Sequence, residues 1–420
     1  MIEHAFTKKN LARVIAHKDI AADPLLIEDS IRDALVTKTM KQIERDTIFS
    51  LPLTKLKISG KTAFTFASVE QELVTRLISK NLRSNYKIRP QNRHTIIRNT
   101  LSFLKEGSPC RLYRYDIVNF FESIDRNAII KKLLDDEKCP RHTIILLDKF
   151  FTSLTAQKIY GLPRGLGISS VLAELQLLPF DKFLRRSDDI FYYSRFVDDI
   201  LILAPHSISQ TDVFEMVVAQ LTPLEVHKVG DKTASINISK MHEDGSTYVS
   251  FEYLGYQFHI FDTPSDSDAV MGIPRRKIDI EISDLKVLKI KNRLIDSFAS
   301  YLHSSSKPDD YNILKNRLKA LTGNYYITDP ISGIPIKTGI YFNYSHKNTF
   351  KRCSLSNLDA LLRGLLYSKH HKLSIRIAKQ ISPSQRMELI GYSFSKGFHN
   401  QVFHSFTHLQ LNAVKKGWHR

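Results

Sequence analysis

The order of apolar and polar residues predicts helices at the start of the chain and a hairpin after them. Residues 1–48 repeat apolar positions at helical spacing and carry Lys and Arg on the polar side. Residues 49–66 alternate apolar and polar residues around a Ser-Gly pair, which is typical of a β-hairpin. Two further helices are predicted over residues 68–84 and 92–107. Ser68 and Gln71 form the pattern of a capping box, and Gly107 is a helix stop.

The middle of the chain mixes strands and helices, which predicts an α+β fold. An apolar hairpin with two adjacent aspartates at its tip is predicted over residues 190–204. The other predicted elements are a strand (111–118), a helix (121–136), a helix opened by the glycine-rich turn 161–167, a helix (210–222) and strands between 233 and 260.

The pattern changes at residues 261–277, which are polar and punctuated by Pro and Gly. We expect a domain boundary there, because the patterns that follow are mainly helical. Helices are predicted at 283–303, 309–323 (with Gly323 as its C-cap) and 354–366, and a strand at 337–345. The expected organisation is an N-terminal helical segment (1–48), a mixed domain (49–262), a helical domain (275–335) and a mainly helical extension (336–420).

Composition indicates a folded, soluble chain. It has 420 residues, 42% hydrophobic and 25% charged, which is enough for two or three domains. Its three cysteines (Cys110, Cys139 and Cys353) form no CxxC pair, so neither a disulfide scaffold nor a structural zinc site is indicated. We expect a reducing cytoplasm as its location. No run of 18 apolar residues and no signal-peptide pattern occurs, so no membrane association is expected.

The formal net charge of +18 predicts a polyanionic partner, most simply a nucleic acid. The alternative is that the charge serves solubility alone. Membrane-surface binding has no support from a strongly basic amphipathic terminus.

Three aspartates lie beside apolar runs: Asp116 in "RLYRYDIVNFF", and Asp198 with Asp199 in "YYSRFVDDILIL". A buried carboxylate needs a partner. Arg114 could share a strand face with Asp116, but one arginine would not satisfy three acids. A divalent cation would, and Mg²⁺ prefers carboxylate oxygens. The alternative is an aspartate pair that closes a tight turn with both side chains in water.

Four segments in order resemble the motifs of reverse transcriptases. "FVDD" in an apolar hairpin resembles the [YF]xDD box, and "YDIVNFFESI" resembles motif A. "GLPRGLGISSVLAEL" resembles motif B, and "FEYLGYQF" resembles the primer grip. Asp116 and Asp198 are 82 residues apart, which suits a right-hand palm. The resemblance covers about residues 50 to 260 and implies fingers and palm over 49–262, a helical thumb over 275–335 and RNA-directed DNA polymerase activity.

The resemblance also implies roles for single residues near the carboxylates. Asp116, Asp198 and the main chain of Ile117 would hold two Mg²⁺ ions, with Mn²⁺ as an alternative and Asp199 in support. Phe120 and Phe121 would lie at the nucleotide. Phe121 would be the aromatic gate that clashes with a ribose 2′-hydroxyl and so selects deoxynucleotides; the alternative is a core aromatic residue.

In motif B, Gly165 and Gly167 would allow the backbone to approach the nucleotide or template closely. Arg164 stands where the family usually has Gln. It would add charge near the incoming nucleotide, or form an ion pair, with Glu174 as a candidate partner. Lys232 resembles the motif D proton donor, with Lys240 as a rival. Candidate triphosphate contacts, each also an ordinary surface charge, are Lys57, Lys61, Arg89 and Arg93.

Downstream residues would hold the nucleic acid. Leu254 and Gly255 belong to the primer-grip motif. A basic helix lies where a thumb would follow the duplex through phosphate contacts, the alternative being a solvated helix face. Its candidate residues are Lys286, Lys289, Lys291 and Arg293. His404 and His408 are spaced i, i+4 on a predicted helix, but they lack a third metal ligand.

The fingers segment "NYKIRPQNRHTIIRNTLSFL", the motif B form "LPRGLGISS" and "KTGIYFNYS" resemble bacterial defence-associated reverse transcriptases. These include the abortive-infection type and the class found as paired polymerase genes. The resemblance implies antiphage defence with a noncoding RNA as template, deoxynucleotides as substrates, a DNA product, and a second reverse transcriptase or another copy of the chain as partner. The alternatives are a retron-like or other cellular reverse transcriptase, and a non-catalytic RNA-binding scaffold.

Overall fold

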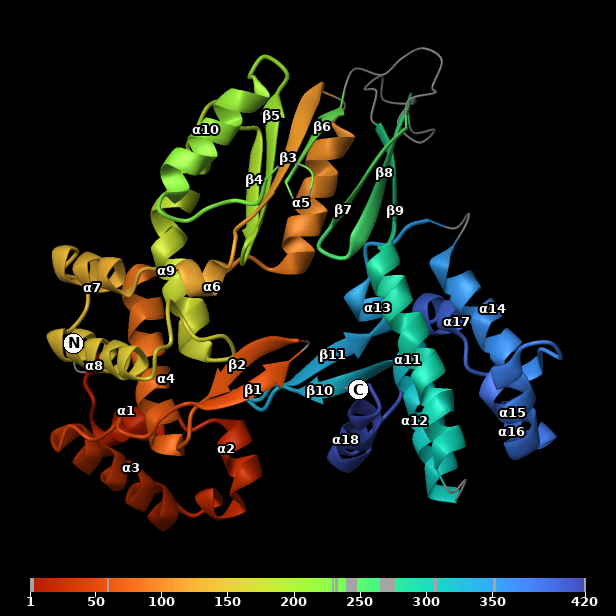
Figure 1. The fold of residues 1–420 in the computed structure, drawn as a ribbon, viewed down its shortest axis with the longest axis horizontal. Coiled ribbons are helices and arrows are strands. Elements are labelled where there is room, and N and C mark those ends of the chain that lie inside the picture. The colour runs from red at the N-terminus through yellow and green to blue at the C-terminus, as the bar shows by residue number, and fades with distance from the viewer. Residues whose placement is uncertain are drawn as a thin grey trace. The chain divides into compact units, whose positions relative to one another are not determined.

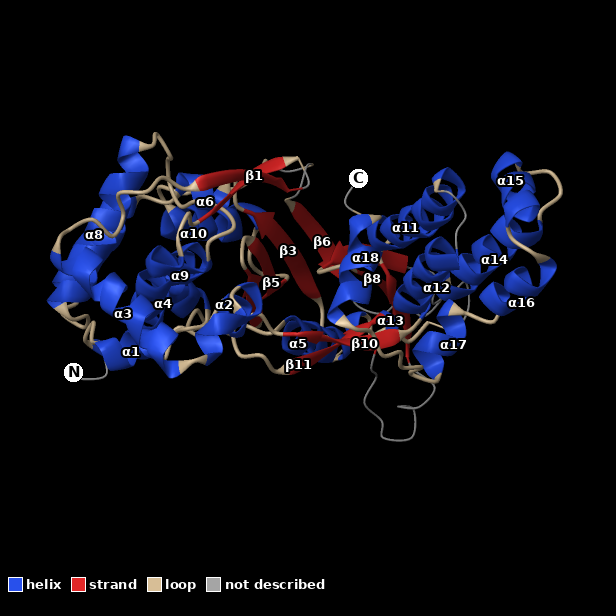
Figure 2. Cartoon of the chain, turned by 90° about the horizontal axis from the view of Figure 1, so that it is seen from below, coloured by secondary structure: helices blue, strands red, loops and turns tan. Residues whose placement is uncertain are grey.

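The computed structural model describes residues 4–58, 60–106, 108–228, 230, 233–238, 248–264, 276–304, 308–349 and 353–418. The chain divides into two compact units. The first comprises Met1–Ile96, Ser108–Lys240 and Pro330–Ser332. The second comprises Ile97–Gly107, Met241–Asp329 and Gly333–Arg420. The chain contains runs of helices and runs of strands (blue and red in Figure 2), which agrees with the predicted α+β class.

A four-stranded antiparallel sheet organises the first unit (Figure 1). Its strand order is β4-β5-β3-β6, where β3 is Cys110–Asp116, β4 is Tyr192–Phe196, β5 is Asp199–Pro205 and β6 is Ala234–Ile238. Helices connect β3 to β4 and β5 to β6, while β4 and β5 form a hairpin. The connectivity is therefore β-α-β-β-α-β, in which the first strand lies at the centre of the sheet.

The helices of the first unit supply most of its core. They are α1 (Lys8–Ala12), α2 (His17–Ala22), α3 (Asp29–Glu44), α4 (Val69–Tyr86), α6 (Phe120–Ser123), α7 (Arg126–Asp135), α8 (Arg141–Ala156), α9 (Gly167–Leu184) and α10 (Gln210–Leu221), with a 3-10 turn, η2, at Pro24–Ile27. A hairpin of β1 (Thr54–Ile58) and β2 (Lys61–Thr65) completes the unit, and α5 (Arg93–Lys105) begins in it. One apolar cluster joins α4, α8, α9 and α10 to alternate residues of β3 and β5, such as Tyr113 and Ile202. The helices therefore cover one face of the sheet.

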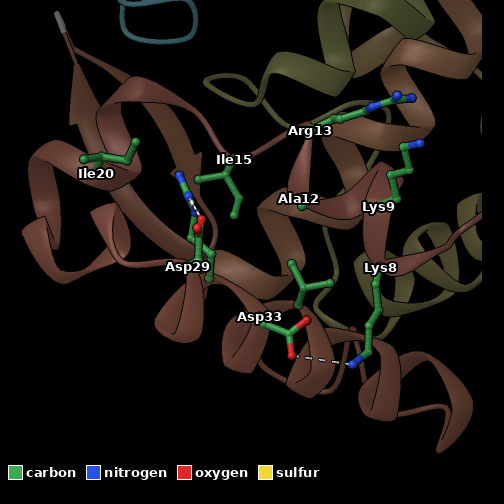
Figure 3. Close-up of a pocket in the computed structure, with 10 residues that line it drawn as sticks. Lys8, Lys9, Ala12, Arg13, Ile15, Ile20, Asp29 and Asp33 are labelled. Carbon is green, nitrogen blue, oxygen red and sulfur yellow. Dashed lines mark hydrogen bonds and ion pairs between the residues drawn. The ribbon is translucent and has the colours of Figure 1, made fainter.

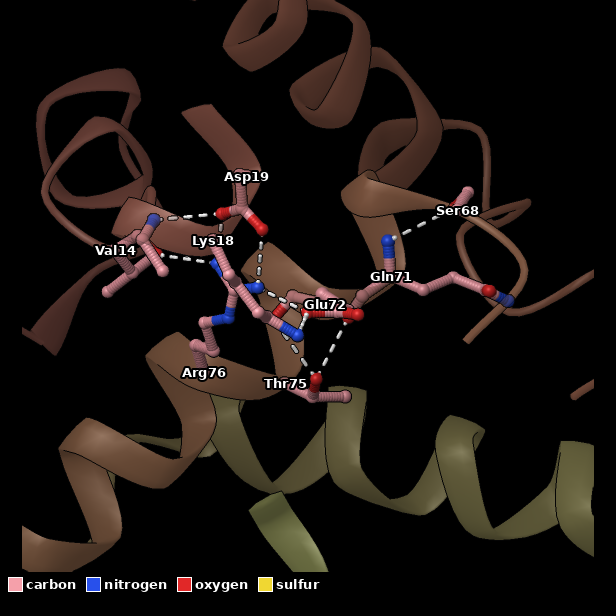
Figure 4. A network of polar contacts seen from close by, with 9 residues as sticks. Val14, Lys18, Asp19, Ser68, Gln71, Glu72, Thr75 and Arg76 are labelled. Carbon is pink, nitrogen blue, oxygen red and sulfur yellow. Dashed lines mark hydrogen bonds and ion pairs between the residues drawn. The ribbon is translucent and has the colours of Figure 1, made fainter. Parts of the chain in front are cut away.

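A network of hydrogen bonds and ion pairs connects the N-terminal helices to α4 (Figure 4). Arg76 on α4 donates two hydrogen bonds to Asp19 of α2 and one to Glu72. Burial raises the pKa of Asp19, but the hydrogen bonds and charge of Arg76 lower it more, so its net pKa is lowered. A cavity of about 610 Å³ lies between α1 and α3 (Figure 3). Lys8 and Asp33 form an ion pair at its edge.

The second unit combines a three-stranded antiparallel sheet, a hairpin and a helical cluster. The sheet contains β7 (Tyr248–Tyr253), β8 (Tyr256–Pro264) and β9 (Arg276–Ile282), and the hairpin contains β10 (Asn324–Thr328) and β11 (Pro335–Gly339). The helices are α11 (Asp284–His303), α12 (Pro308–Thr322), α13 (Ile340–Asn343), α14 (Ser354–Tyr367), α15 (Lys372–Gln380), α16 (Pro383–Ile390), α17 (Phe394–His399) and α18 (His408–Lys416). No described helix of either unit is long and apolar enough to cross a membrane.

Several elements differ from the sequence predictions. The expected single helix over 121–136 is two helices, α6 and α7, because Asp125 leaves the helical conformation to cap α7. Helix α8 and strand β9 were not predicted. The expected domain boundary at 261–277 overlaps the ends of β8 and β9, which pair with each other. The expected strand over 337–345 changes into α13 after β11.

The predicted caps are also confirmed only in part. Ser68 accepts a hydrogen bond from the Gln71 amide, but the Gln71 side chain donates to the carbonyl of Leu51. The capping box is therefore incomplete. Gly107 lies outside the described residues. His404 precedes α18, which begins at His408, so the two histidines do not share a helix face.

Candidate active site

The three sequence-predicted aspartates meet at one end of the central sheet of the first unit. In the antiparallel pair of β3 and β5, Asp116 lies directly opposite Asp199. Asp198 is at the tip of the β4-β5 hairpin, where Val197 adopts a positive φ of 61°. The Ile117 amide donates to the Asp198 carbonyl at 3.3 Å, which continues the strand pairing to the tip. Strand register therefore sets the relative positions of all three residues.

Arg114 neutralises Asp199. Its Nε and one Nη donate to the two carboxylate oxygens at 2.9 and 3.1 Å. Burial raises the pKa of Asp199; Arg114 lowers it, and the negative charges of Asp116 and Asp198 raise it further, so the net pKa is raised. Burial and the neighbouring carboxylates together therefore outweigh the effect of Arg114 on Asp199.

The segment that follows α10 pairs with the backbone around Asp116. The Val118 amide donates to the backbone carbonyl of Glu225 at 2.8 Å, and Ile117 forms a β-bridge with Val226. The His227 amide donates to the Asp116 carbonyl at 2.9 Å, and its Nε2 lies 3.3 Å from Asp116 Oδ1. Sequence reasoning missed His227, because no motif surrounds it. Only pairing between segments more than 100 residues apart brings it to the site.

The donor chemistry of this sheet end fits a hard divalent cation. Asp116 is buried, and the three carboxylates carry more negative charge than Arg114 offsets. Carboxylate and carbonyl oxygens are the ligands that Mg²⁺ prefers. Within the described part of the chain, no three acidic, histidine or cysteine side chains are grouped closely enough to form a preassembled metal site.

Phe120 and Phe121 follow Asp116 on α6 and differ in exposure. Phe120 is buried in the core, while Phe121 is half-buried, with the two ring centroids 5.3 Å apart. The guanidinium of Arg164 lies 5.5 Å from the centroid of the Phe121 ring. Phe121 therefore contacts both a core aromatic ring and a cation.

Arg164 forms an ion pair, but its partner is Glu122 and not Glu174. Its Nε and one Nη donate to the two Glu122 oxygens at 2.5 and 2.9 Å. Burial raises the pKa of Glu122, and Arg164 lowers it more, so the net pKa is lowered. The charge of Lys61 contributes in the same direction. Glu174 is unsuitable because it already accepts hydrogen bonds from Arg195.

Contacts within the chain explain why two positions of the motif B turn are glycine. A Cβ on Gly161, at φ +57°, would lie 2.3 Å from the Glu122 carbonyl oxygen. A Cβ on Gly165, at φ +95°, would lie 2.7 Å from the Phe64 carbonyl oxygen. Gly167 has open space at the same position. The predicted reason, approach to nucleotide or template, is therefore not needed for Gly165, whose nearest neighbour is β2.

Arg195 on β4 connects the aspartate hairpin to helix α9. Its side chain is 3% exposed and contacts both Glu174 and Asp181 of α9. One Nη donates to the Val197 carbonyl at 2.8 Å, immediately before Asp198. The hairpin that carries two of the aspartates is thus fixed to the core by a buried cation. Sequence reasoning did not identify this residue.

The other predicted site residues are distributed over both units. Arg93 begins α5 and is half-buried, and Lys57 and Lys61 are exposed on the β1-β2 hairpin. Lys232 and Lys240 lie outside the described residues. In the second unit, Leu254 and Gly255 form the β7-β8 turn with positive φ, while α11 carries the predicted thumb cations. Of these, Lys286 and Lys289 are exposed, and Lys291 and Arg293 are half-buried.

No protein-family model matches the chain. No curated protein matches it. Among solved structures it is similar to telomerase from Candida albicans in complex with the TWJ fragment of telomeric RNA, at 12% identity and a TM-score of 0.30. The match covers 82% of this chain and 53% of that one, so the chain spans about half the length of the telomerase chain. A likeness at this level carries no argument about function.

Proposed function

We propose that this chain is an RNA-directed DNA polymerase, a nucleotidyltransferase that adds deoxynucleotides to a DNA strand on an RNA template. The meeting of Asp116, Asp198 and Asp199 at one end of the β4-β5-β3-β6 sheet carries the proposal. The four ordered motifs that resemble reverse transcriptases support it. The β-α-β-β-α-β connectivity is compatible with the right-hand palm that those motifs imply.

Asp116, Asp198 and the Ile117 carbonyl are the proposed ligands of two Mg²⁺ ions, with Mn²⁺ as an alternative. When bound, such ions supply the charge that activates a 3′-hydroxyl and stabilises the leaving pyrophosphate. The chain's own contribution is placement, because the register of two hydrogen-bonded strands sets Asp116 opposite Asp199 and beside the hairpin tip that carries Asp198. Asp199, held by Arg114, adds negative charge in support. Lys232 is the proposed proton donor to pyrophosphate.

Phe121 is the proposed gate beneath the sugar of the incoming nucleotide. Phe120 and Arg164 both contact its ring and would help to hold it against a ribose 2′-hydroxyl. Glu122 in turn holds Arg164 by two hydrogen bonds. The proposed role of Arg164 is therefore to hold the gate residue in place. Gly165 and Arg93 complete the nucleotide-binding set that the motifs imply.

The proposal extends to the nucleic acid and to biology. Leu254, Gly255 and the cations of α11 would contact primer and template backbones, which is compatible with the exposure of Lys286 and Lys289. The template would be a noncoding RNA, and the setting cytoplasmic antiphage defence with a second reverse transcriptase or another copy of the chain. These finer points rest on the motif resemblance alone.

The test is incorporation of labelled dNTPs by the full chain, purified without nuclease so that bound nucleic acid is retained. We expect Mg²⁺-dependent DNA synthesis that Asp198→Asn reduces at least about 1,000-fold, because the variant keeps the side-chain shape and removes the charge. A matched control is Asp188→Asn, an exposed aspartate ahead of the same hairpin. Absence of dNTP incorporation by the wild-type chain with its co-purified RNA would refute the proposal, as would full activity of Asp198→Asn. RNA binding without synthesis would favour the scaffold alternative.

A further inference from the structure

The last helices of the second unit present a surface that is rich in cations. Between Asp359 and Glu388 the sequence contains six Lys and Arg residues and no acidic residue. The six are Arg363, Lys369, Lys372, Arg376, Lys379 and Arg386. They lie on α14, α15, α16 and the turn between α14 and α15. We call this the α15 surface. Surfaces that serve solubility alone usually mix both signs, so a run of this kind needs another cause.

Helix α15 directs its cations away from the core. Ser374 and Ile377 are buried, while Lys372, Arg376 and Lys379 are exposed. At 100° per residue, these three cations lie opposite the buried pair and span about 10 Å along the helix. Among the described residues, none of the three forms an ion pair. Their charge is therefore directed to solvent.

The row of cations is rigidly mounted. The Ser374 hydroxyl donates to the Gly364 carbonyl of α14 at 2.7 Å, and Ile377 packs into the core cluster of the unit. Figure 1 shows α14, α15 and α16 gathered together in this unit. A fixed row of charges binds a polyanion with less entropic cost than the same charges on a mobile tail.

An aromatic residue lies beside the cations in a hollow of the same surface. Tyr367 is 43% exposed, and the Arg386 guanidinium lies 5.7 Å from its ring centroid. Tyr367 and Arg363 help to line a hollow of about 550 Å³ along α14. The acid in this hollow, Asp359, accepts hydrogen bonds from Ser393 and from the Phe394 and Ser395 amides, so its charge is largely offset within the fold. An exposed ring among cations can stack a base while neighbouring cations bind phosphates.

We propose that the α15 surface binds a single-stranded nucleic-acid segment, with phosphates on Lys372, Arg376 and Lys379 and a base on Tyr367. A membrane surface is a poorer partner, because Ile377 of α15 is buried in the core cluster and Ile375 is the one large apolar side chain that this helix leaves exposed. A duplex is also poorer, because its paired bases offer no free face to Tyr367. The site does not rest on the proposed polymerase activity, since every residue in it lies in the second unit.

The test measures binding of the full chain to a fluorescein-labelled 24-nucleotide poly(U) RNA by anisotropy over a salt series. The test variant is Lys372→Gln/Arg376→Gln/Lys379→Gln, whose side chains are exposed and leave the core unchanged. Loss of three phosphate contacts should reduce the slope of log affinity against log salt by about 2. The ratio of wild-type affinity to variant affinity should therefore be about 20-fold larger at 50 mM than at 200 mM salt. Tyr367→Ala should weaken binding about tenfold without changing the slope.

The matched control is Lys182→Gln/Arg185→Gln/Arg186→Gln, which removes the same charge from exposed positions of the first unit. Equal weakening in both triple variants would overturn the proposal, because net charge alone would then explain binding. Photo-crosslinks from 4-thiouridine should map to residues 363–387, and their absence there would overturn it too. Binding to a 24-base-pair duplex and to phosphatidylserine vesicles is measured in the same way. If the α15 triple variant loses more affinity for one of these ligands than for the single strand, that ligand replaces the single strand as the partner.

One further variant separates this proposal from the proposed polymerase. Asp116→Asn/Asp198→Asn should keep the crosslinks on the α15 surface, whether or not the wild-type chain synthesises DNA. Failure of synthesis with crosslinks retained leaves the α15 surface supported. If the wild-type chain synthesises DNA and the α15 triple variant binds RNA as tightly as wild type, the proposal for the α15 surface is refuted and the polymerase proposal stands.

Discussion

Replacement of Arg195 by Met should destabilise the first unit strongly. The guanidinium donates two hydrogen bonds to Asp181, at 2.9 and 2.8 Å, and two to Glu174, at 3.1 and 2.7 Å. A fifth goes to the Val197 carbonyl. Methionine keeps much of the volume and removes every donor. Two carboxylates, 8% and 16% exposed, would then lie close together without their cation.

The magnitude follows from the burial of all three groups. Removal of one partner from a buried ion pair costs about 3–5 kcal/mol, because the remaining charge stays desolvated. For a unit of this size, each kcal/mol lowers Tm by about 2–4 °C, so a fall of about 10 °C is expected. Arg186→Met, at an exposed position, should change stability by less than about 0.5 kcal/mol.

The assay has to report on the first unit. The single tryptophan, Trp418, belongs to the second unit, so its fluorescence does not serve. Urea unfolding followed by far-UV circular dichroism reports on the whole chain, and hydrogen exchange of peptides from residues 190–205 assigns the change to the hairpin of the first unit. Arg195→Met should speed exchange there, because the bond to Val197 is lost.

A triple variant decides whether the unpaired charges are the cause. Arg195→Met/Asp181→Asn/Glu174→Gln removes the cation and both anions, and it should recover at least about half of the lost stability, since neutral replacement of a buried ion pair is often nearly neutral in energy. The reasoning is refuted if Arg195→Met lies within about 1 kcal/mol of wild type, or if the triple variant is no more stable than the single one.

Three other substitutions test separate parts of the structure. Asp19→Asn should destabilise the chain by about 3 kcal/mol at pH 7, because Arg76 loses its buried partner. The pKa of Asp19 is lowered by folding, so its contribution is present above the unfolded pKa and is lost as pH falls through the folded one. The gap in urea midpoint between variant and wild type should therefore narrow as the pH falls below the ordinary value of 3.8. Gly161→Ala should lower Tm by several degrees while Gly167→Ala does not, because only the first Cβ meets backbone at 2.3 Å; equal effects would contradict this account of the motif B turn. Phe121→Ala should raise incorporation of ribonucleotides relative to deoxynucleotides by about tenfold or more, and an unchanged ratio in single-nucleotide extension would show that the ring is only a core residue.

Periodicity predicted the local elements of the proposed site well. The apolar runs on both sides of Asp198 and Asp199 became β4 and β5, and the strand predicted over 111–118 became β3. The prediction of β5 succeeds because a strand buried on both faces needs a continuous apolar run, and residues 200–204 are all buried. The same logic could have found α8, since Ile144, Leu147, Phe151 and Leu154 recur at helical spacing and are buried.

Partner choice was predicted much less well. The ion pair of Arg164 was expected as an alternative, but its partner is Glu122, 42 residues away in the chain. The glycine at position 165 was identified, but its neighbour is the Phe64 backbone. In both cases the residue type indicates a constraint, and only the packing of α6 and β2 against the motif B turn identifies the group that imposes it.

The sequence by itself determined that three aspartates lie beside apolar runs and that the chain carries a large positive charge. These properties depend on neighbours within one or two turns, so periodicity reveals them. The tertiary structure alone decided that Asp116 faces Asp199, that Arg114 reaches Asp199 across 85 residues, and that His227 lies beside Asp116. Such contacts arise from strand register and core packing, which the whole fold sets and which no short segment encodes.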